Sequence, residues 1–221
     1  MFFTRFRMNP NMRGSVRLAA SPQRMHATIL SAFPPDRIEL PSGRVLWRLD
    51  TPTRHEWTLY IVSPARPSME QLQSECGWSQ EPSWQTADYG RFLDTLTKGQ
   101  RWRFRLTANP VRSVAQGRGQ RGRIQPHVTA EQQLAWLVER SANHGFRIDG
   151  DLEGPTVVTR RERGSFQRGK GAGRVRATLS RAQFDGLLDI SDPELLRTTL
   201  TQGLGRAKAY GCGLMTLARL P

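Results

Sequence analysis

The sequence is poor in the residue types that build most metal and redox sites. It contains only two cysteines, Cys76 and Cys212, which do not form a C-x-x-C pair, and only four histidines. This pattern argues against a zinc site and is typical of a reduced intracellular protein. The acidic residues are scattered, whereas a two-metal nuclease needs several clustered carboxylates to hold its ions. We therefore expect neither a metal ion nor another cofactor.

Long apolar runs are also missing. No stretch of 18 consecutive apolar residues occurs, and the first residues do not resemble the apolar region of a signal peptide. We therefore expect a cytoplasmic protein with no membrane partner. The sequence also lacks the G-K-[ST] signature of a nucleotide-binding P-loop and the G-x-S-x-G signature of a serine hydrolase.

Positive charge is abundant, and arginine carries almost all of it. The chain has a formal net charge of +14 and a pI near 11.3, and its only lysines are Lys98, Lys170 and Lys208. A soluble protein with such an excess usually binds a polyanion. Arginine adds bidentate recognition of phosphate and guanine, which lysine lacks. Composition therefore predicts a nucleic-acid partner.

The order of the predicted elements suggests two similar halves. Alternation, capping residues and prolines predict strands at 2–8, 44–50, 56–63, 99–110, 146–148, 155–159, 175–179 and 184–190 and a final strand near the C-terminus, and helices at about 21–33, 69–76, 129–145 and 194–201. We read 9–20 and 116–125 as basic loops and 82–89 as irregular. The order is β-α-β-β-α-β twice, which predicts an α+β protein with two tandem ferredoxin-like domains, at residues 1–95 and 96–221.

A glycine-rich segment near the C-terminus has two interpretations. It contains Gly203, Gly205, Gly211 and Gly213, with Arg206 and Lys208 between them. Backbone N–H groups beside a cation can hold a phosphate, so the segment is a candidate anion site. A tight connection between a helix and the last strand would also need glycines.

His26 is the only histidine without a simple structural explanation. His55 lies in a predicted turn, His127 in a loop, and His144 at a helix C-terminus, where it would favour the helix dipole. His26 lies on the first helix beside the apolar stripe, with Arg24 close by. From the residues alone, a packed or surface histidine is the more common outcome. The alternative is a catalytic base in RNA self-cleavage, kept neutral by nearby arginines.

The segment 160–176 is the most basic stretch of the chain. Only Glu162 interrupts its cations, which are Arg160, Arg161, Arg163, Arg168, Lys170, Arg174 and Arg176. Flanking strand pieces favour an arginine-tipped hairpin that enters a groove of structured RNA. The alternative is a mobile, solvated loop. Arg13 and Arg24, on the segments before and within the first helix, complete the predicted RNA contacts.

Four stretches together resemble a known family. They are N-P-N-M-R followed by S-P-Q-R-M-H-A-T-I-L, R-F-R-L-T-A-N-P at 103–110, E-Q-Q-L-A-W-L-V-E-R with Trp136, and the glycine-rich segment with Lys208. They are similar, in the same order, to the CRISPR-associated endoribonucleases that mature guide RNA in type I-E (Cascade) systems, the CasE family. The matches span nearly the whole chain.

The resemblance implies a tandem ferredoxin-like fold and a metal-independent cut in the CRISPR repeat RNA, 3′ of its stem-loop. The 2′-hydroxyl of the RNA would attack the adjacent phosphorus and leave a 2′,3′-cyclic phosphate or a 3′-phosphate. His26 falls on the family's catalytic histidine, as general base or acid, and the 160–176 region on the arginine-bearing hairpin that grips the stem. Family members then stay in the Cascade complex, so its other subunits are expected partners.

One departure from the family pattern affects the predicted chemistry. Family members carry a tyrosine three residues before the histidine, where this chain has Gln23. An amide can form hydrogen bonds but cannot act as a phenol acid. Gln23, Lys208 and Tyr210 are therefore candidate assisting residues, with Tyr210 as a substitute hydroxyl. The competing hypothesis is a non-catalytic subunit that binds an RNA hairpin within a ribonucleoprotein complex.

Overall fold

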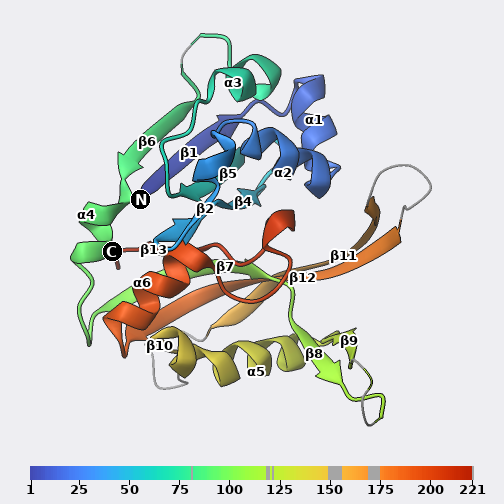
Figure 1. Ribbon diagram of the computed structural model, residues 1–221, viewed down its shortest axis with the longest axis vertical. Coiled ribbons are helices and arrows are strands. Elements are labelled where there is room, and N and C mark those ends of the chain that lie inside the picture. The colour runs from blue at the N-terminus through green and yellow to red at the C-terminus, as the bar shows by residue number, and fades with distance from the viewer. Residues whose placement is uncertain (81, 118–119, 121, 149–155, 169–174, 221) are drawn as a thin grey trace.

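Two antiparallel sheets, each with helices beside it, make up the protein (Figure 1). The computed structural model describes residues 1–220 except 81, 118–119, 121, 149–155 and 169–174. The parts of the predicted 116–125 loop and 155–159 strand that fall in these gaps lie outside the described residues, as do Lys170 and Arg174. We call the two sheets with their helices the first unit and the second unit.

The first unit has the ferredoxin-like strand order. Its sheet runs β4-β5-β1-β6 and is antiparallel throughout. The strands are β1 (Phe2–Met8), β4 (Leu46–Asp50), β5 (Trp57–Ser63) and β6 (Trp84–Asp88). The helices are α1 (Arg13–Ala19), α2 (Pro22–Leu30), α3 (Glu70–Cys76) and α4 (Tyr89–Asp94). The 3₁₀ turn η1 (Pro35–Arg37) and the short pair β2 (Glu39–Leu40) and β3 (Gly43–Arg44) lie between α2 and β4.

The second unit repeats this order with a longer hairpin. Its sheet runs β10-β12-β7-β13, and β11 pairs with β12. The strands are β7 (Arg101–Ala108), β10 (Phe146–Arg147), β11 (Val157–Arg168), β12 (Val175–Ile190) and β13 (Met215–Ala218). The helices are α5 (Ala130–Ser141) and α6 (Pro193–Gln202), with 3₁₀ turns η2 (Ala142–His144) and η4 (Lys208–Tyr210). The tandem ferredoxin-like fold is therefore confirmed.

Local signals explain where the longer elements begin and end. Thr129 and Gln132 form a reciprocal capping box at the start of α5, which satisfies two of the N–H groups that a helix leaves unpaired. Gly145 follows η2 with a φ of 82°, a left-handed conformation that glycine adopts without strain. Trp102, Phe104 and Leu106 alternate along β7 and face the core.

Three predicted irregular segments contain regular structure. Residues 9–20 were expected to be a loop, but 13–19 form α1, because Ser15 and Leu18 are buried against the rest of the first unit. Residues 82–89 contain the edge strand β6, which pairs with β1. The last three residues of the predicted 116–125 loop lie in β9 (Arg123–Pro126), which pairs with β8 (Val111–Val114). In each case long-range pairing or burial decides the structure, and local sequence does not carry that information.

The two units share part of one core. A first apolar cluster joins α2 to the first sheet through residues such as Phe6, Met25 and Ile61. The larger cluster surrounds Phe184 and Leu200 of the second unit and includes Leu46 from β4 of the first unit. The division at residues 95 and 96 stays a prediction, because apolar contacts cross it.

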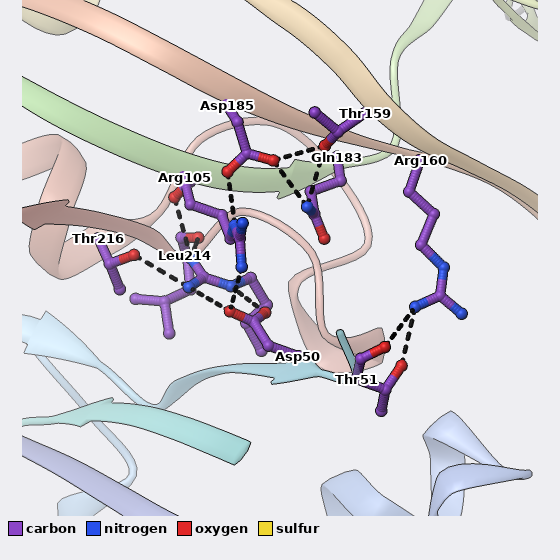
Figure 2. A network of polar contacts seen from close by, with 10 residues as sticks. Asp50, Thr51, Arg105, Thr159, Arg160, Gln183, Asp185, Leu214 and Thr216 are labelled. Atoms are coloured by element: carbon purple, nitrogen blue, oxygen red, sulfur yellow. Dashed lines mark hydrogen bonds and ion pairs between the residues drawn. The ribbon is translucent and has the colours of Figure 1, made fainter. Parts of the chain in front are cut away.

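A buried arginine fixes β4 of the first unit against the second unit. Arg48 is 2% exposed and forms two hydrogen bonds with Asp50, at 2.7 and 3.0 Å. Its Nη1 donates to the backbone oxygens of Arg105 and Leu214, at 2.9 and 3.1 Å, and its Nη2 donates to Thr216 Oγ1 at 2.9 Å. Figure 2 shows this network, in which Arg105 also reaches Asp50 and Asp185.

We predict that Arg48→Ala lowers the free energy of unfolding by about 3–5 kcal/mol, because it leaves two backbone carbonyls without their buried donor and Asp50 with Arg105 alone. Urea unfolding measures the change. The control is Arg37→Ala, which removes an exposed ion pair with Asp36 and should change the free energy by no more than about 0.5 kcal/mol. Equal effects of the two variants would contradict the role given to Arg48.

Candidate active site

Helix α2 presents His26 at the edge of the first core. Ser21 accepts a hydrogen bond from the Arg24 backbone N–H, and Pro22 occupies the first turn, so the helix start is defined by the sequence. Met25 and Ile29 are buried against the first sheet. The ring of His26, beside this apolar stripe, is half-buried. Gln23 is half-buried and Arg24 is exposed on the same helix.

Trp47 of β4 holds the His26 ring. The indole Nε1–H donates a hydrogen bond to His26 Nδ1 at 3.3 Å. Indole nitrogen is only a donor, so Nδ1 must be the acceptor nitrogen. A neutral imidazole carries one proton, which is then on Nε2. The contact therefore leaves Nε2–H as the group that His26 offers to a ligand.

The surroundings of His26 favour its neutral form. Burial, and then the positive charge of Arg44, lower the pKa of His26 below its ordinary value. Both effects disfavour the imidazolium. At neutral pH the ring is therefore a neutral hydrogen-bond donor.

The glycine-rich segment makes the tight connection that was one of its two interpretations. Gly203, Gly205, Gly211 and Gly213 have φ values between 77° and 92°, and Ala207 between them has 66°. A Cβ atom on Gly211 would lie 2.7 Å from the Trp47 ring. Close packing and left-handed backbone therefore account for glycine at these positions. The predicted phosphate contacts of the segment stay a prediction.

Turn η4 of this segment lies against α2 and carries Lys208 and Tyr210. Contacts between η4 and both α2 and β4 join the segment to the helix that bears His26. The side chains of Lys208 and Tyr210 are half-buried, and Arg206 is exposed. Nothing in the sequence indicates that Tyr210 lies near this helix. The fold brings the turn and the helix together although they are far apart along the chain.

Arg44 is a site residue that the sequence did not reveal. Its charge lowers the pKa of Lys208, after burial, and also that of His26. Its Nη1 forms an ion pair with Glu39 at 3.2 Å. Its Nε is buried and has no hydrogen-bond partner within the described part of the chain. Arg44 is the second residue of the two-residue strand β3, which has no recognisable motif, so nothing local marked it.

The arginine-bearing hairpin of the sequence analysis is formed by β11 and β12. Arg160 donates to Thr51 Oγ1 at 2.8 Å and forms an ion pair with Glu162 at 2.5 Å. Arg161 donates to the Val128 carbonyl at 3.2 Å, and Arg163 is exposed. Arg168 on β11 faces Val175, and Arg176 on β12 faces Gln167, in the register of the hairpin. A strand pair replaces the alternative of a mobile loop for the described residues of 160–176.

The remaining predicted contact, Arg13, is exposed on α1. Contacts join α1 to α2, so Arg13 lies on the helix next to the one that carries His26. Within the described ranges, no group of three or more His, Cys, Asp or Glu residues could hold a metal ion. None of the described helices is long and apolar enough to span a bilayer.

Comparisons with known proteins give a consistent result. A family model described as "CRISPR associated protein" matches residues 1–219. The CRISPR-associated endoribonuclease Cse3 of Thermus thermophilus is 31% identical over 229 residues, which cover 99% of this chain and 100% of that protein. The CRISPR system Cascade subunit CasE of Escherichia coli is 32% identical over 126 residues, which cover 53% of this chain and 57% of that protein. A structure of CRISPR endoribonuclease Cse3 bound to 19 nt RNA matches with a TM-score of 0.80 and 28% identity, covering 99% of each chain.

We predict that Arg44→Gln raises the pKa values of His26 and Lys208 toward their ordinary values, because it removes the positive charge that lowers both. NMR titration of the His26 ring measures the first shift. Arg24→Gln is the matched control, since it removes an exposed arginine from the helix of His26 itself and should leave the His26 pKa unchanged. An unchanged His26 pKa in Arg44→Gln would show that Arg44 does not act on the ring.

Proposed function

Because the chain belongs to the family of CRISPR-associated proteins, we propose that it is an endoribonuclease that cuts CRISPR repeat RNA 3′ of the stem-loop. We propose also that it acts in the cytoplasm and stays bound to the product as a subunit of a Cascade complex. Its relatives bear the names endoribonuclease and Cascade subunit. The observation that carries the proposal is the neutral His26, held by Trp47 beside Arg44 and the turn of Lys208.

The proposed reaction needs no metal ion, because the RNA supplies its own nucleophile. The 2′-hydroxyl gives its proton to solvent water as its oxygen forms a bond to the adjacent phosphorus, and the bond from phosphorus to the 5′-oxygen breaks. The 5′-oxygen takes up a proton from the hydrogen-bond donor beside it, which regains one from solvent, and leaves as a hydroxyl. A 2′,3′-cyclic phosphate remains on the upstream product and opens to a 3′-phosphate if water attacks it.

His26 is assigned to the departing 5′-oxygen. Its Nε2–H can donate a hydrogen bond there, whereas the same nitrogen has no lone pair with which to take the 2′-hydroxyl proton. A neutral imidazole can polarise an oxygen in this way when its surroundings disfavour the imidazolium. The Trp47 N–H and the Arg44 charge stabilise the electron density that collects on the ring as Nε2–H donates.

The cations beside His26 are assigned to the phosphate. Two of its oxygens gain negative charge as the 2′-oxygen adds, and preorganised donors stabilise such charge. Arg44 has a buried Nε without a partner among the described residues, and Lys208 lies on the neighbouring turn. Gln23 and Tyr210 are assisting residues in this proposal, with the Gln23 amide as an orienting group and the Tyr210 hydroxyl in the position of the missing phenol.

The β11–β12 hairpin is assigned to the RNA stem. Arg160, Arg161 and Arg163 lie on β11, and their guanidinium groups are suited to phosphate oxygens. Arg13, Arg24 and Arg206 are exposed on α1, α2 and the glycine-rich segment and would extend the contact. The glycine-rich segment would supply N–H groups beside Lys208. Arg168, Lys170, Arg174 and Arg176 belong to the same proposed contact.

We predict that His26→Ala fails to cut an ordinary repeat RNA in EDTA but cuts one whose scissile 5′-oxygen is replaced by sulfur. A thiolate leaves without a proton donor, so the loss of about 10²–10⁴-fold expected for a missing proton donor should largely disappear. Single-turnover gel assays with labelled RNA measure both rates, and His55→Ala, in a turn of the first unit, is the matched histidine control.

Other outcomes of this assay contradict particular parts of the proposal. A wild-type protein that cuts RNA with a 2′-deoxy group at the nucleotide 5′ of the cut does not use 2′-hydroxyl attack. Equal loss of activity on oxygen and sulfur substrates would remove His26 from the leaving group. Tight binding without any cutting by the wild-type protein would favour the non-catalytic RNA-hairpin-binding subunit.

We predict that replacing Arg160, Arg161 and Arg163 together with glutamine weakens RNA binding and flattens its salt dependence. Each lost phosphate contact should reduce the slope of log K against log salt by about one. Fluorescence anisotropy at several salt concentrations measures the slope. The control replaces three arginines that lie outside the proposed RNA contacts, Arg37, Arg66 and Arg91, together with glutamine. An unaltered slope in the hairpin variant would contradict the assignment of these arginines.

A further inference from the structure

A pocket of about 260 Å³ lies between the two units, next to the candidate active site. Leu18 and Pro22 line it from α1 and α2, Trp47 and Trp57 from the first sheet, and Gln183 from β12. We call it the interdomain pocket. Its volume is slightly below the roughly 300–1,000 Å³ of pockets that hold drug-sized ligands, so it suits a single planar ring system.

The walls of the interdomain pocket combine aromatic faces with fixed polar groups. Trp47 is 3% exposed, and Gly211 covers part of its six-membered ring. Trp57 is half-buried at the start of β5. Trp47 contributes only a small accessible part of its ring to the lining, whereas the accessible part of the Trp57 indole offers an apolar surface of the kind on which bases stack.

The polar wall belongs to the β11–β12 hairpin. Glu162 forms ion pairs with Arg160 at 2.5 Å and Arg181 at 2.9 Å, so all three side chains are held in place. The Gln183 amide lies next to them on β12 and donates to Thr159 and Asp185. Figure 2 shows Arg160 reaching across to Thr51 of the first unit. A carboxylate, an amide and guanidinium groups on one wall can both donate to and accept from the edge of a base.

A single side chain, that of Trp47, connects the interdomain pocket to His26. The same Trp47 that lines the pocket donates to His26 Nδ1. A base held against Trp47 would therefore belong to a nucleotide next to the phosphate that His26 contacts. A base within the stem would have its edge paired and both faces stacked, so it would not fit such a pocket.

We propose that the interdomain pocket binds the base of one unpaired nucleotide adjacent to the scissile phosphate, and this inference rests on the proposed function. The Trp57 indole contacts one face of the base, and the Glu162–Arg181–Gln183 wall contacts its edge. Removing that nucleotide from the RNA helix aligns the strand at the cut. Trp57 and the polar wall thus contribute to the choice of the cut site.

A double-mutant cycle between protein and RNA tests the proposal. The probes are a set of RNAs based on a repeat that the wild-type protein cuts, each made uncuttable by a 2′-deoxy group at the nucleotide 5′ of the cut. Each RNA carries a single abasic site, placed at one of the three nucleotides on either side of the cut. Trp57→Ala should weaken binding of the unmodified RNA by about 5- to 150-fold, the range for losing one base–aromatic stack. An abasic site at one of these positions should weaken binding by the wild-type protein by a similar factor. The same abasic site should leave binding by Trp57→Ala almost unchanged.

Two further variants keep the test specific. Trp57→Phe retains a ring and should recover most of the affinity that Trp57→Ala loses. Trp78→Ala removes a tryptophan that is 42% exposed and does not line the pocket, so its losses at every abasic position should equal those of wild type. A cooperative thermal melt shows that each variant is folded.

The possible results distinguish failure of the pocket assignment from failure of the proposed function. If Trp57→Ala and every abasic site act additively while the RNA is still bound and cut, the interdomain pocket does not hold a base and the proposed endoribonuclease stands. If the wild-type protein neither binds nor cuts any repeat RNA, the proposed function fails and the pocket assignment fails with it.

Discussion

The structure depends on how Arg48 is satisfied where the two units meet. A buried guanidinium is costly unless its charge and its donors all find partners, and Arg48 finds them in Asp50, two backbone carbonyls and Thr216. Successive side chains of a strand point to opposite faces. Arg48 therefore turns toward the second unit, while Trp47 beside it turns toward His26. One strand, β4, fixes both the orientation of the units and the geometry of the candidate active site.

The glycine-rich segment acts on the same strand. β4 is an edge strand of the first sheet, and edge strands need protection from unwanted pairing. Gly203 approaches Leu46 and Gly211 approaches Trp47, two neighbours whose side chains leave β4 on opposite sides. The segment therefore wraps around the edge of β4, which requires close approach and left-handed backbone. Core packing already determines the shape of this loop, and an RNA-binding role would use that shape. A glycine substitution there would therefore disturb stability and function together.

Most of the fold could be predicted from the sequence because its longer elements carry strong local signals. The alternation along β7 and the capping box of α5 are examples of such signals. Helix α1 and strand β6 could not be predicted, since burial of Leu18 and pairing with β1 decide them. His26 and Lys208 could be nominated by residue type and resemblance. Trp47 and Arg44 could not be nominated in this way. The hydrogen bond from Trp47 to His26 joins residues 21 positions apart, and the effect of Arg44 on His26 and Lys208 exists only in the folded chain.

The charge of the protein is arranged unevenly, and the arrangement favours a bound anion at the site. Aspartates pair with two of the three arginines of β7, Arg101 with Asp189 and Arg105 with Asp185. Around His26 the balance is different, because burial, and then the positive charge of Arg44, lowers the pKa values of both His26 and Lys208. The Arg44 contribution to the Lys208 shift reflects repulsion between two cations that the fold holds near each other. A phosphate bound between Arg44 and Lys208 would attract both cations, so the proposed substrate would supply the negative charge that this part of the site lacks.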